Sequence, residues 1–317
     1  MKYIKDLIFS DLYIRLDGWG IPHYRPTAAK TAGVKNIYLS EDYFKDVKAL
    51  ETQIVKKGMD NGDDLIIHNG ERYRISKQEM ANEEIWCSLR KIATDIPDID
   101  NLGFDSNILR ILKGLGGRAG LLVIAGATGN GKTTSSFALL DYYLKSYGDL
   151  AFSIEDPVEY DMNGRRGKSG YCFQMKVNND EDWAKCLKTA LRWNPHYIVV
   201  GEIRTPEAAS QLLRAASSGH LVLTTVHAGS IEETIMSLIQ LSEMDMGKRG
   251  QQLLSDALIG IVYQELLNNK LSTSAVFTEA GNPGDPVRSL IRNGKTSLLG
   301  SVIEQQRIRI EKNSFMM

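Results

Sequence analysis

Apolar and polar positions along the chain change their pattern near residue 105. Before it, short stretches alternate apolar and polar residues, as in "DLYIRLD" at 11–17, which is typical of half-buried strands. After it, short unbroken apolar runs alternate with helix-like segments, which is typical of parallel strands buried on both faces. We therefore expect an α+β domain at residues 1–96, a linker at 97–106 and an α/β domain at 107–317 that ends in a helical part.

Local signals divide the first region into elements. The stretch from Ser40 to Gly58 is predicted to form a helix, because Ser40 suits an N-cap, Glu41 and Asp42 suit the first turn, and glycine suits the end. Two alternating stretches follow, joined by "NG" at 69–70, which predicts a hairpin. The segment "EIWCSLRKIA" at 84–93 is predicted to be another strand, and "TDIPDIDNLGFD" at 94–105 has the turn residues of a linker.

The second region contains four apolar strands that each end in polar residues. They are "GLLVIAG" at 120–126, "LAFSIED" at 150–156, "HYIVVGE" at 196–202 and "HLVLTTVHA" at 220–228. Open α/β sheets bind ligands at the edge where their parallel strands end. We therefore look for chemistry among the residues that follow these strands.

The first of these strands leads into "GATGNGKTT" at 126–134. It matches the phosphate-loop pattern G-x-x-x-x-G-K-[ST] at Gly126, Gly131, Lys132 and Thr133. Glycines let successive backbone N–H groups point inward and form an anion site at a helix N-terminus. The pattern predicts a nucleoside triphosphate, with Lys132 at the β and γ phosphates and the Thr133 hydroxyl on Mg²⁺. The remaining loop residues expected at the nucleotide are Thr128, Gly129, Asn130 and Thr134.

Carboxylates and histidines follow the later strands. Glu155, Asp156 and Glu159 come close to where Mg²⁺ and a water would sit, although three acids in five residues also suit a solvated turn. Glu202 ends its strand, where a carboxylate can orient or deprotonate the attacking water.

Two histidines flank the fourth strand. His220 precedes this strand and His227 follows it. A lone histidine is more often structural than catalytic, but His227 at a polar strand end is in a position to sense the γ phosphate.

Composition narrows the class of protein without identifying it. Hydrophobic residues make up 43% and charged residues 24%, as in ordinary globular proteins. Lys and Arg number 38 against 39 Asp and Glu, so no basic field predicts nucleic-acid binding. The three cysteines, Cys87, Cys172 and Cys186, lie far apart, which favours buried thiols in a reducing cytoplasm. No apolar run approaches the roughly 18 residues of a spanning helix, so we expect no insertion into a membrane.

Four segments together resemble one family, the secretion ATPases of type IV pili and type II secretion. Besides the phosphate loop, "EDPVE" at 155–159, "VGEIRT" at 200–205 and "GHLVLTTVH" at 219–227 are similar to its EDPIE, VGEMRD and GHLVxxTLH boxes, in the same order. "YQELL" at 263–267 is similar to its Q-x-L segment. "VRSLIRNGK" at 287–295 resembles the AIRNLIREGK motif of the retraction motors, the PilT type, which is therefore the most similar branch.

The resemblance implies a RecA-like P-loop NTPase domain with a central, mostly parallel sheet, preceded by a small PAS-like α+β domain. It implies that Glu155 and Glu159 surround the metal and water, with Glu155 at the metal, that Glu202 is the general base, and that His220 and His227 belong to a catalytic histidine box. Family members form hexamers with nucleotide between subunits. In these hexamers, basic residues of the N-terminal domain reach the nucleotide of a neighbouring subunit. The arginines at the matching strands here are Arg72, Arg74 and Arg90.

The implied function is a cytoplasmic, Mg²⁺-dependent motor ATPase, a homo-hexamer that acts on an inner-membrane platform protein in pilus retraction. Departures from the family leave alternatives open. His196 and Thr205 replace acids of the family pattern, which keeps open a nucleotide-gated module that scarcely hydrolyses ATP. The stretch from Gly18 to Asn36 departs from the usual retraction-motor start, which keeps open a DotB-type secretion or conjugative-transfer ATPase. A RecA-like nucleic-acid translocase is disfavoured by the balanced charge.

Overall fold

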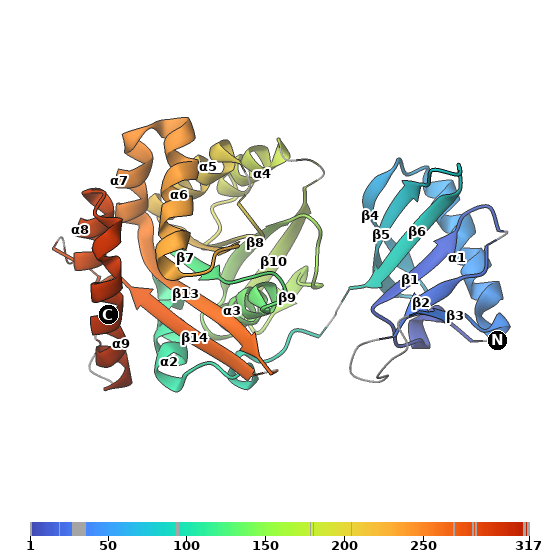
Figure 1. Cartoon of the computed structure of the whole chain (residues 1–317), viewed down its shortest axis with the longest axis horizontal. Helices are drawn as coiled ribbons and strands as arrows, with labels where there is room; N and C mark the ends of the chain where they lie inside the picture. The colour runs from blue at the N-terminus through green and yellow to red at the C-terminus, as the bar shows by residue number, and fades with distance from the viewer. Residues whose placement is uncertain are drawn as a thin grey trace. The chain divides into compact units, whose positions relative to one another are not determined.

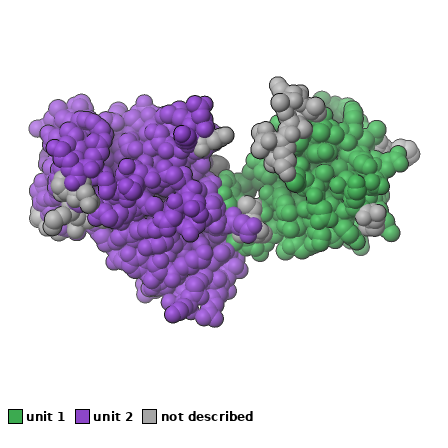
Figure 2. Space-filling model, turned by 90° about the horizontal axis from the view of Figure 1, so that it is seen from below, with its two compact units in different colours: residues 1–94, 157–161 green, residues 95–156, 162–317 purple. Residues whose placement is uncertain are grey.

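The computed structural model describes residues 2–18, 20–26, 36–92, 95–177, 179, 181–203, 205–268, 270–280, 282, 284–312 and 315. These residues form two compact units, coloured separately in Figure 2. The N-terminal unit comprises residues 1–94 together with 157–161, and the C-terminal unit comprises 95–156 and 162–317. The chain thus leaves the C-terminal unit after Asp156 and returns to it at Met162. Residues 27–35 of the unusual N-terminal stretch lie outside the described residues.

The N-terminal unit is an antiparallel sheet with one long helix (Figure 1). Its six strands run in the order β3-β2-β1-β6-β5-β4, and α1 packs against the sheet through residues such as Val47, Leu50 and Ile54. The elements are β1 (Asp11–Arg15), β2 (His23–Arg25), β3 (Ile37–Tyr38), α1 (Phe44–Lys57), β4 (Gly62–His68), β5 (Glu71–Glu79) and β6 (Ile85–Lys91).

The predicted local signals of this unit are confirmed. Ser40 caps a short 3-10 turn at Glu41–Tyr43, which leads into α1, and Gly58 ends α1 with φ of 63°. Asn69 and Gly70, with φ of 51° and 83°, connect β4 to β5. Two positive φ angles are what a type I′ turn requires, so this dipeptide fixes the hairpin register.

The C-terminal unit is an eight-stranded mixed sheet with helices on both faces (Figure 1). The strand order is β14-β13-β7-β12-β11-β8-β10-β9, with parallel neighbours from β13 to β10 and antiparallel strands at the two edges. The strands are β7 (Gly120–Ala125), β8 (Asp149–Glu155), β9 (Gly164–Arg166), β10 (Gly170–Lys176), β11 (Tyr197–Val200), β12 (Leu221–Val226), β13 (Leu258–Leu267) and β14 (Lys270–Phe277).

Helices cover this sheet because its central strands are apolar on both faces. α3 packs against β7, β8, β11 and β12, while α5 packs against β7 and β12. The helices are α2 (Ser106–Gly114), α3 (Lys132–Ser146), α4 (Asp182–Leu191), α5 (Pro206–Ser217), α6 (Ile231–Met246), α7 (Lys248–Ala257), α8 (Pro286–Arg292) and α9 (Leu299–Glu311). The expected α/β class with a mostly parallel sheet is confirmed.

Two hairpins in this unit were not predicted. β9 and β10 extend the sheet beyond β8, and β13 and β14 extend it beyond β7, inside the part expected to be helical. β13 begins with a buried run at Leu258–Val262, and such a run does not by itself distinguish a strand from a helix. Its pairing with β7 shows that this run is a strand.

Candidate nucleotide-binding site

The glycine loop has the backbone that a phosphate site needs. β7 ends at Ala125 and α3 begins at Lys132, so the loop connects a buried strand to a helix N-terminus. Gly126, Gly129 and Gly131 have φ angles of 151°, 83° and 76°, which side chains other than glycine rarely adopt. The loop therefore lies where the N–H groups and the dipole of α3 favour an anion.

Strand β13 supports the loop from one side. A Cβ atom placed on Gly126 would lie 2.3 Å from the carbonyl oxygen of Gln264. The buried side chain of Gln264 donates from Nε2 to the Asn130 carbonyl at 2.5 Å. The backbone N–H of Leu266 donates to Asn130 Oδ1 at 3.3 Å. The tip of the loop is thus fixed by hydrogen bonds to a strand far away in the sequence.

Replacing Gly126 with alanine is expected to destabilise the fold and weaken nucleotide binding. The new Cβ would collide with the Gln264 backbone, and the φ of residue 126 is one that alanine rarely adopts. Such backbone strain lowers the free energy of unfolding by about 1–3 kcal/mol. Gly114→Ala is the matched control, because Gly114 has a helical φ of −70° and nothing within 4 Å of a Cβ. Urea unfolding and ADP titration of both variants measure the effect. Equal unfolding midpoints for the two variants would contradict the close approach of Gln264.

The Lys132 ammonium lies inside the loop. It is 6% exposed and donates from Nζ to the carbonyl oxygens of Gly126 and Ala127 at 2.8 and 2.9 Å. Nζ also lies 3.3 Å from His227 Nδ1, and the Thr128 hydroxyl lies 3.3 Å from the same nitrogen. An ammonium can only donate, so Nδ1 is the acceptor in this pair and the ring proton belongs on Nε2. The loop therefore carries a fixed positive charge with His227 directly beside it.

Glu202 lies on the other side of His227. The distance from His227 Nε2 to Glu202 Oε1 is 3.7 Å, and the two side chains are 44% and 31% exposed. The Thr225 hydroxyl ties the two strand ends together by donating to the Gly201 carbonyl at 2.6 Å. Lys132, His227 and Glu202 thus form a row of cation, imidazole and carboxylate at the carboxyl edge of the sheet, open to solvent at its acidic end.

Glu155 ends the neighbouring strand β8 and is 2% exposed. Its Oε1 accepts hydrogen bonds from Ser153 Oγ at 2.7 Å and from Gln174 Nε2 at 2.9 Å. The Gly201 N–H donates to the Ile154 carbonyl at 2.9 Å, so the Glu155 and Glu202 strand ends lie side by side. Two donors on one carboxylate oxygen fix the direction of the Glu155 side chain.

Threonine hydroxyls complete the phosphate side of the site. Thr133 and Thr134 occupy the first turn of α3 and are half-buried. Among the described residues, no three His, Cys, Asp or Glu side chains gather as a metal cluster. The Thr133 hydroxyl is the group of this loop that could hold Mg²⁺ together with phosphate oxygens.

His220 lies away from this cluster. It precedes β12, at the amino end of the strand, and its backbone carbonyl accepts from the N–H of Gly120 at the start of β7. Its buried ring contacts the Pro195 carbonyl through Nδ1 at 2.5 Å. The phosphate loop follows the opposite, carboxyl end of the same sheet. The two histidines of the expected box are thus separated by the length of β12, and only His227 joins the loop.

The three nominated arginines lie on β5 and β6 of the N-terminal unit, where each is paired with an acid. The pairs are Arg72 with Asp161 at 2.9 Å, Arg74 with Asp63 at 2.5 Å, and Arg90 with Asp11 at 2.7 Å. Glu159 is exposed and belongs to the 157–161 segment of this unit. It lines a depression of about 200 Å³ together with Arg74, Arg90 and Lys91. The structure thus places Glu159 with the arginines in the N-terminal unit.

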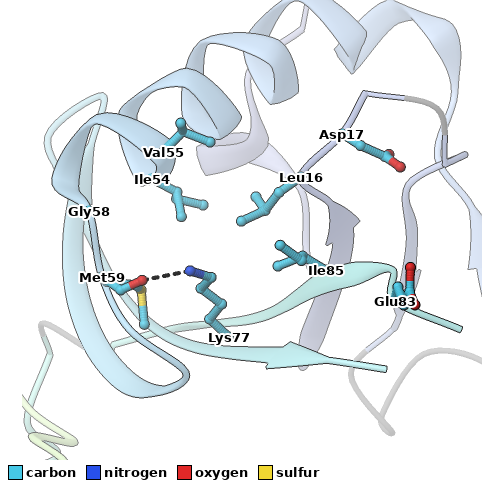
Figure 3. A pocket seen from close by; sticks show the side chains of 9 residues that line it. All are labelled: Leu16, Asp17, Ile54, Val55, Gly58, Met59, Lys77, Glu83 and Ile85. Carbon is cyan, nitrogen blue, oxygen red and sulfur yellow. Dashed lines mark hydrogen bonds between the residues drawn. The ribbon is translucent and has the colours of Figure 1, made fainter. Parts of the chain in front are cut away.

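The N-terminal unit also has an apolar cleft of about 300 Å³ between α1 and the sheet (Figure 3). Ile54, Leu16 and Ile85 line it, and Lys77 crosses it to donate to the Met59 carbonyl at 2.6 Å. None of the site residues predicted from the sequence lines this cleft.

The cysteines behave as buried apolar residues. Cys87 and Cys172 are buried and Cys186 is half-buried. Burial raises the pKa of the Cys172 thiol to about 12 and that of Cys87 to about 11. Both thiols therefore stay protonated at neutral pH and are poor nucleophiles.

Two residues that contact the site were not nominated from the sequence as site residues. Gln264 holds the loop tip, and its segment "YQELL" had been noted only for its resemblance to the family. Gln174 holds Glu155, and no signal in the sequence distinguishes it from an ordinary strand residue.

A buried parallel strand, a glycine loop and a helix N-terminus, with polar residues at the neighbouring strand ends, define the C-terminal unit as a P-loop nucleotide-binding domain. Its particular family follows from comparison with known proteins. Residues 65–301 match the family model described as Type II/IV secretion system protein, and the chain belongs to this family.

Curated relatives match more than half of the chain. The type IV pilus retractation ATPase PilT of Pseudomonas aeruginosa is 32% identical over 187 residues, which are 58% of this chain and 53% of that protein. The type IV pilus ATPase PilU of the same organism is 34% identical over 200 residues, 62% of this chain and 50% of that protein. The chain thus spans about half the length of the curated relatives that it matches.

Solved structures extend the likeness to nearly the whole fold. The pilus retraction motor PilT with bound ADP has a TM-score of 0.74 and 25% identity, covering 96% of this chain and 90% of that one. The Legionella pneumophila ATPase DotB has a TM-score of 0.69 and 19% identity, covering 97% and 85%, which shows the shared fold. Among the residues that the structure describes, none of the helices combines the length and apolarity of a membrane span.

Proposed function

We propose that this chain is a Mg²⁺-dependent ATPase that works as a motor of type IV pilus retraction or of a related pilus or secretion process. The row formed by Lys132, His227 and Glu202 at the mouth of the phosphate loop carries the proposal. It combines a cation for the phosphates with a solvent-accessible carboxylate for the water. The relation to PilT, whose structure was solved with ADP, supports a nucleotide in the same loop.

Each residue of the row has a distinct proposed role. Lys132 exchanges its two loop carbonyls for β and γ phosphate oxygens when ATP binds. Glu202 orients and deprotonates the attacking water, and Glu155 beside it, held by two hydrogen bonds, would act at the metal and water. His227 lies beside the Lys132 ammonium and senses the γ phosphate. Thr133 would hold Mg²⁺, which when bound neutralises charge on the phosphates.

The two residues that depart from the family pattern lie outside the row formed by Lys132, His227 and Glu202. Thr205 caps α5 by accepting from the Ala208 N–H at 3.2 Å, so it has a structural function of its own. His196 precedes β11 and its Nε2 contacts the Gly116 carbonyl at 3.1 Å, at the amino edge of the sheet. The carboxyl edge keeps Glu155 and Glu202, which favours hydrolysis over a module that only binds ATP.

The assembly that we propose is a homo-hexamer on the cytoplasmic side of an inner membrane, acting on a platform protein. Arg72, Arg74 and Arg90 of one subunit would reach the nucleotide of the next, where a guanidinium neutralises charge on the transferring phosphoryl group. In this structure each of these arginines is paired with an acid. The balanced net charge of −1 gives no support to nucleic acid as a partner.

Phosphate release from the purified full chain tests the enzymatic part. We expect multiple turnovers of ATP with Mg²⁺, loss of release when the metal is chelated, and recovery when Mg²⁺ is restored. Mass photometry on the same sample tests the hexamer. ATP that stays bound and uncleaved for hours would instead support a nucleotide-gated module.

A deletion strain tests which machine the motor serves. Loss of twitching with pili still present on the surface supports retraction. Unchanged twitching with loss of protein secretion or of DNA transfer supports a motor of the DotB type.

A further inference from the structure

Gln174 of β10 connects two parts of the C-terminal unit that are far apart in the sequence. Its Nε2 donates to Glu155 Oε1 at 2.9 Å. Its Oε1 accepts from the backbone N–H groups of Met162 and Asn163 at 2.8 and 2.9 Å. Its own backbone N–H donates to Asn163 Oδ1 at 3.2 Å. One amide group thus bridges the Glu155 carboxylate and the backbone at 162–163.

The backbone at 162–163 is the point where the chain returns from its excursion into the N-terminal unit. The preceding segment, 157–161, belongs to that unit, and its last residue Asp161 pairs with Arg72 of β5 at 2.9 Å. Asp161 and Met162 are consecutive residues. A displacement of the 157–161 segment is therefore applied directly to the N–H groups that Gln174 holds.

The amide of Gln174 matches the chemistry of the bridge. The Met162 and Asn163 N–H groups need an acceptor, and the Glu155 oxygen accepts from a donor. An amide presents an acceptor and a donor on two separate atoms, and glutamine has the length observed here. A carboxylate at 174 would keep the acceptor but offer Glu155 no donor.

We propose that Gln174 is a positioning residue for hydrolysis, which aligns the Glu155 carboxylate and links its alignment to the 157–161 segment. This rests on the proposed function, in which Glu155 acts at the nucleotide. When the segment is held by the N-terminal unit, Gln174 is fixed at both ends and Glu155 points in one direction. When the segment shifts, Gln174 shifts with it and Glu155 loses a donor.

Steady-state ATPase kinetics of the full chain test the alignment. Gln174→Ala is expected to lower kcat roughly 10-fold and to change ADP affinity less than twofold, because the loop and Lys132 are untouched. Gln305→Ala, at an exposed position of α9, is the matched control and should match the parent. Gln174→Glu keeps the acceptor for Met162 and Asn163 but removes the donor to Glu155, so it should lower kcat as Gln174→Ala does while ADP affinity again changes less than twofold.

Hydrogen exchange separates alignment from folding. The Met162 and Asn163 amides should be protected in the parent and in Gln174→Glu, and exchange faster in Gln174→Ala. A parent-like kcat in both variants overturns the proposal. An equal loss of ADP affinity and kcat also overturns it, since that indicates a general structural role. If the parent itself does not hydrolyse ATP, the proposed function fails first and the positioning role falls with it.

A double-mutant cycle tests the link to the segment. Asp161→Asn weakens the pair with Arg72 and should lower kcat in the same direction as Gln174→Ala. If the link exists, the double variant is no slower than Gln174→Ala alone, because the second change acts through a contact already lost. Fully multiplicative effects on kcat would refute the link and leave only the alignment of Glu155.

Discussion

Replacing Glu202 with glutamine is expected to abolish turnover while ATP binding and assembly persist. Glutamine keeps the size of the side chain and its acceptor oxygen, but it cannot take a proton from water. General-base catalysis contributes about 10²- to 10⁴-fold, so phosphate release should fall by at least about 100-fold. ADP affinity should change little, because glutamine keeps the size of the side chain beside His227 and leaves Lys132 in place. Phosphate release and ADP titration on the same preparation measure both quantities.

The control for this variant is Glu207→Gln, which changes the same side chain at the nearby start of α5. We expect it to match the parent in turnover. If Glu202→Gln hydrolyses ATP as fast as the parent, Glu202 is not the base, and the buried Glu155 becomes the next candidate. If Glu202→Gln also loses ADP, the acid instead contributes to nucleotide binding.

Replacing Lys132 with alanine is expected to remove nucleotide binding at ordinary concentrations. Hydrogen bonds to charged groups contribute about 1.5–3 kcal/mol, and each 1.4 kcal/mol is a factor of about ten, so ATP affinity should fall roughly 10- to 100-fold. The fold should survive, because the hydrogen bonds of the ammonium to the Gly126 and Ala127 carbonyls lie within the loop itself. Fluorescent ATP titration and thermal unfolding measure the two effects.

Lys168→Ala is the matched control, since Lys168 is exposed in the turn between β9 and β10. Its affinity for ATP should equal that of the parent. Retained ATP affinity in Lys132→Ala would contradict a phosphate role for the lysine. A large fall in the unfolding temperature of Lys132→Ala would show that the buried ammonium is needed mainly to hold the loop.

Much of the fold could be read from local patterns, because local physics controls it. The "NG" turn fixes a hairpin through two positive φ angles, and "GKTT" begins a helix that a short glycine loop connects to the preceding strand. The two unpredicted hairpins show that local patterns do not identify every strand. The run at the start of β13 is equally compatible with a helix until β7 lies beside it and takes its hydrogen bonds.

Part of the candidate site could likewise be predicted from the sequence, and part could not. The phosphate loop is continuous in sequence, so Gly126 and Lys132 could be nominated with their chemistry. Glu202 and His227 are brought together only by the parallel pairing of β11 and β12. The same pairing carries His220 to the opposite edge, although it stands only seven positions before His227 in the sequence. A six-residue strand between them, with its rise of about 3.3 Å per residue, separates the two rings.

The sequence by itself therefore determined the class of ligand, since a contiguous loop of glycines, lysine and threonine needs no distant partner to form an anion site. Only the tertiary structure decided which acids and histidines share that site, and which amides orient them. Gln174 and Gln264 act through contacts made across neighbouring strands, and strand order is a property of the whole sheet rather than of any segment. Hydrogen bonds between residues so far apart produce no periodic pattern in the sequence, and local patterns therefore do not predict them.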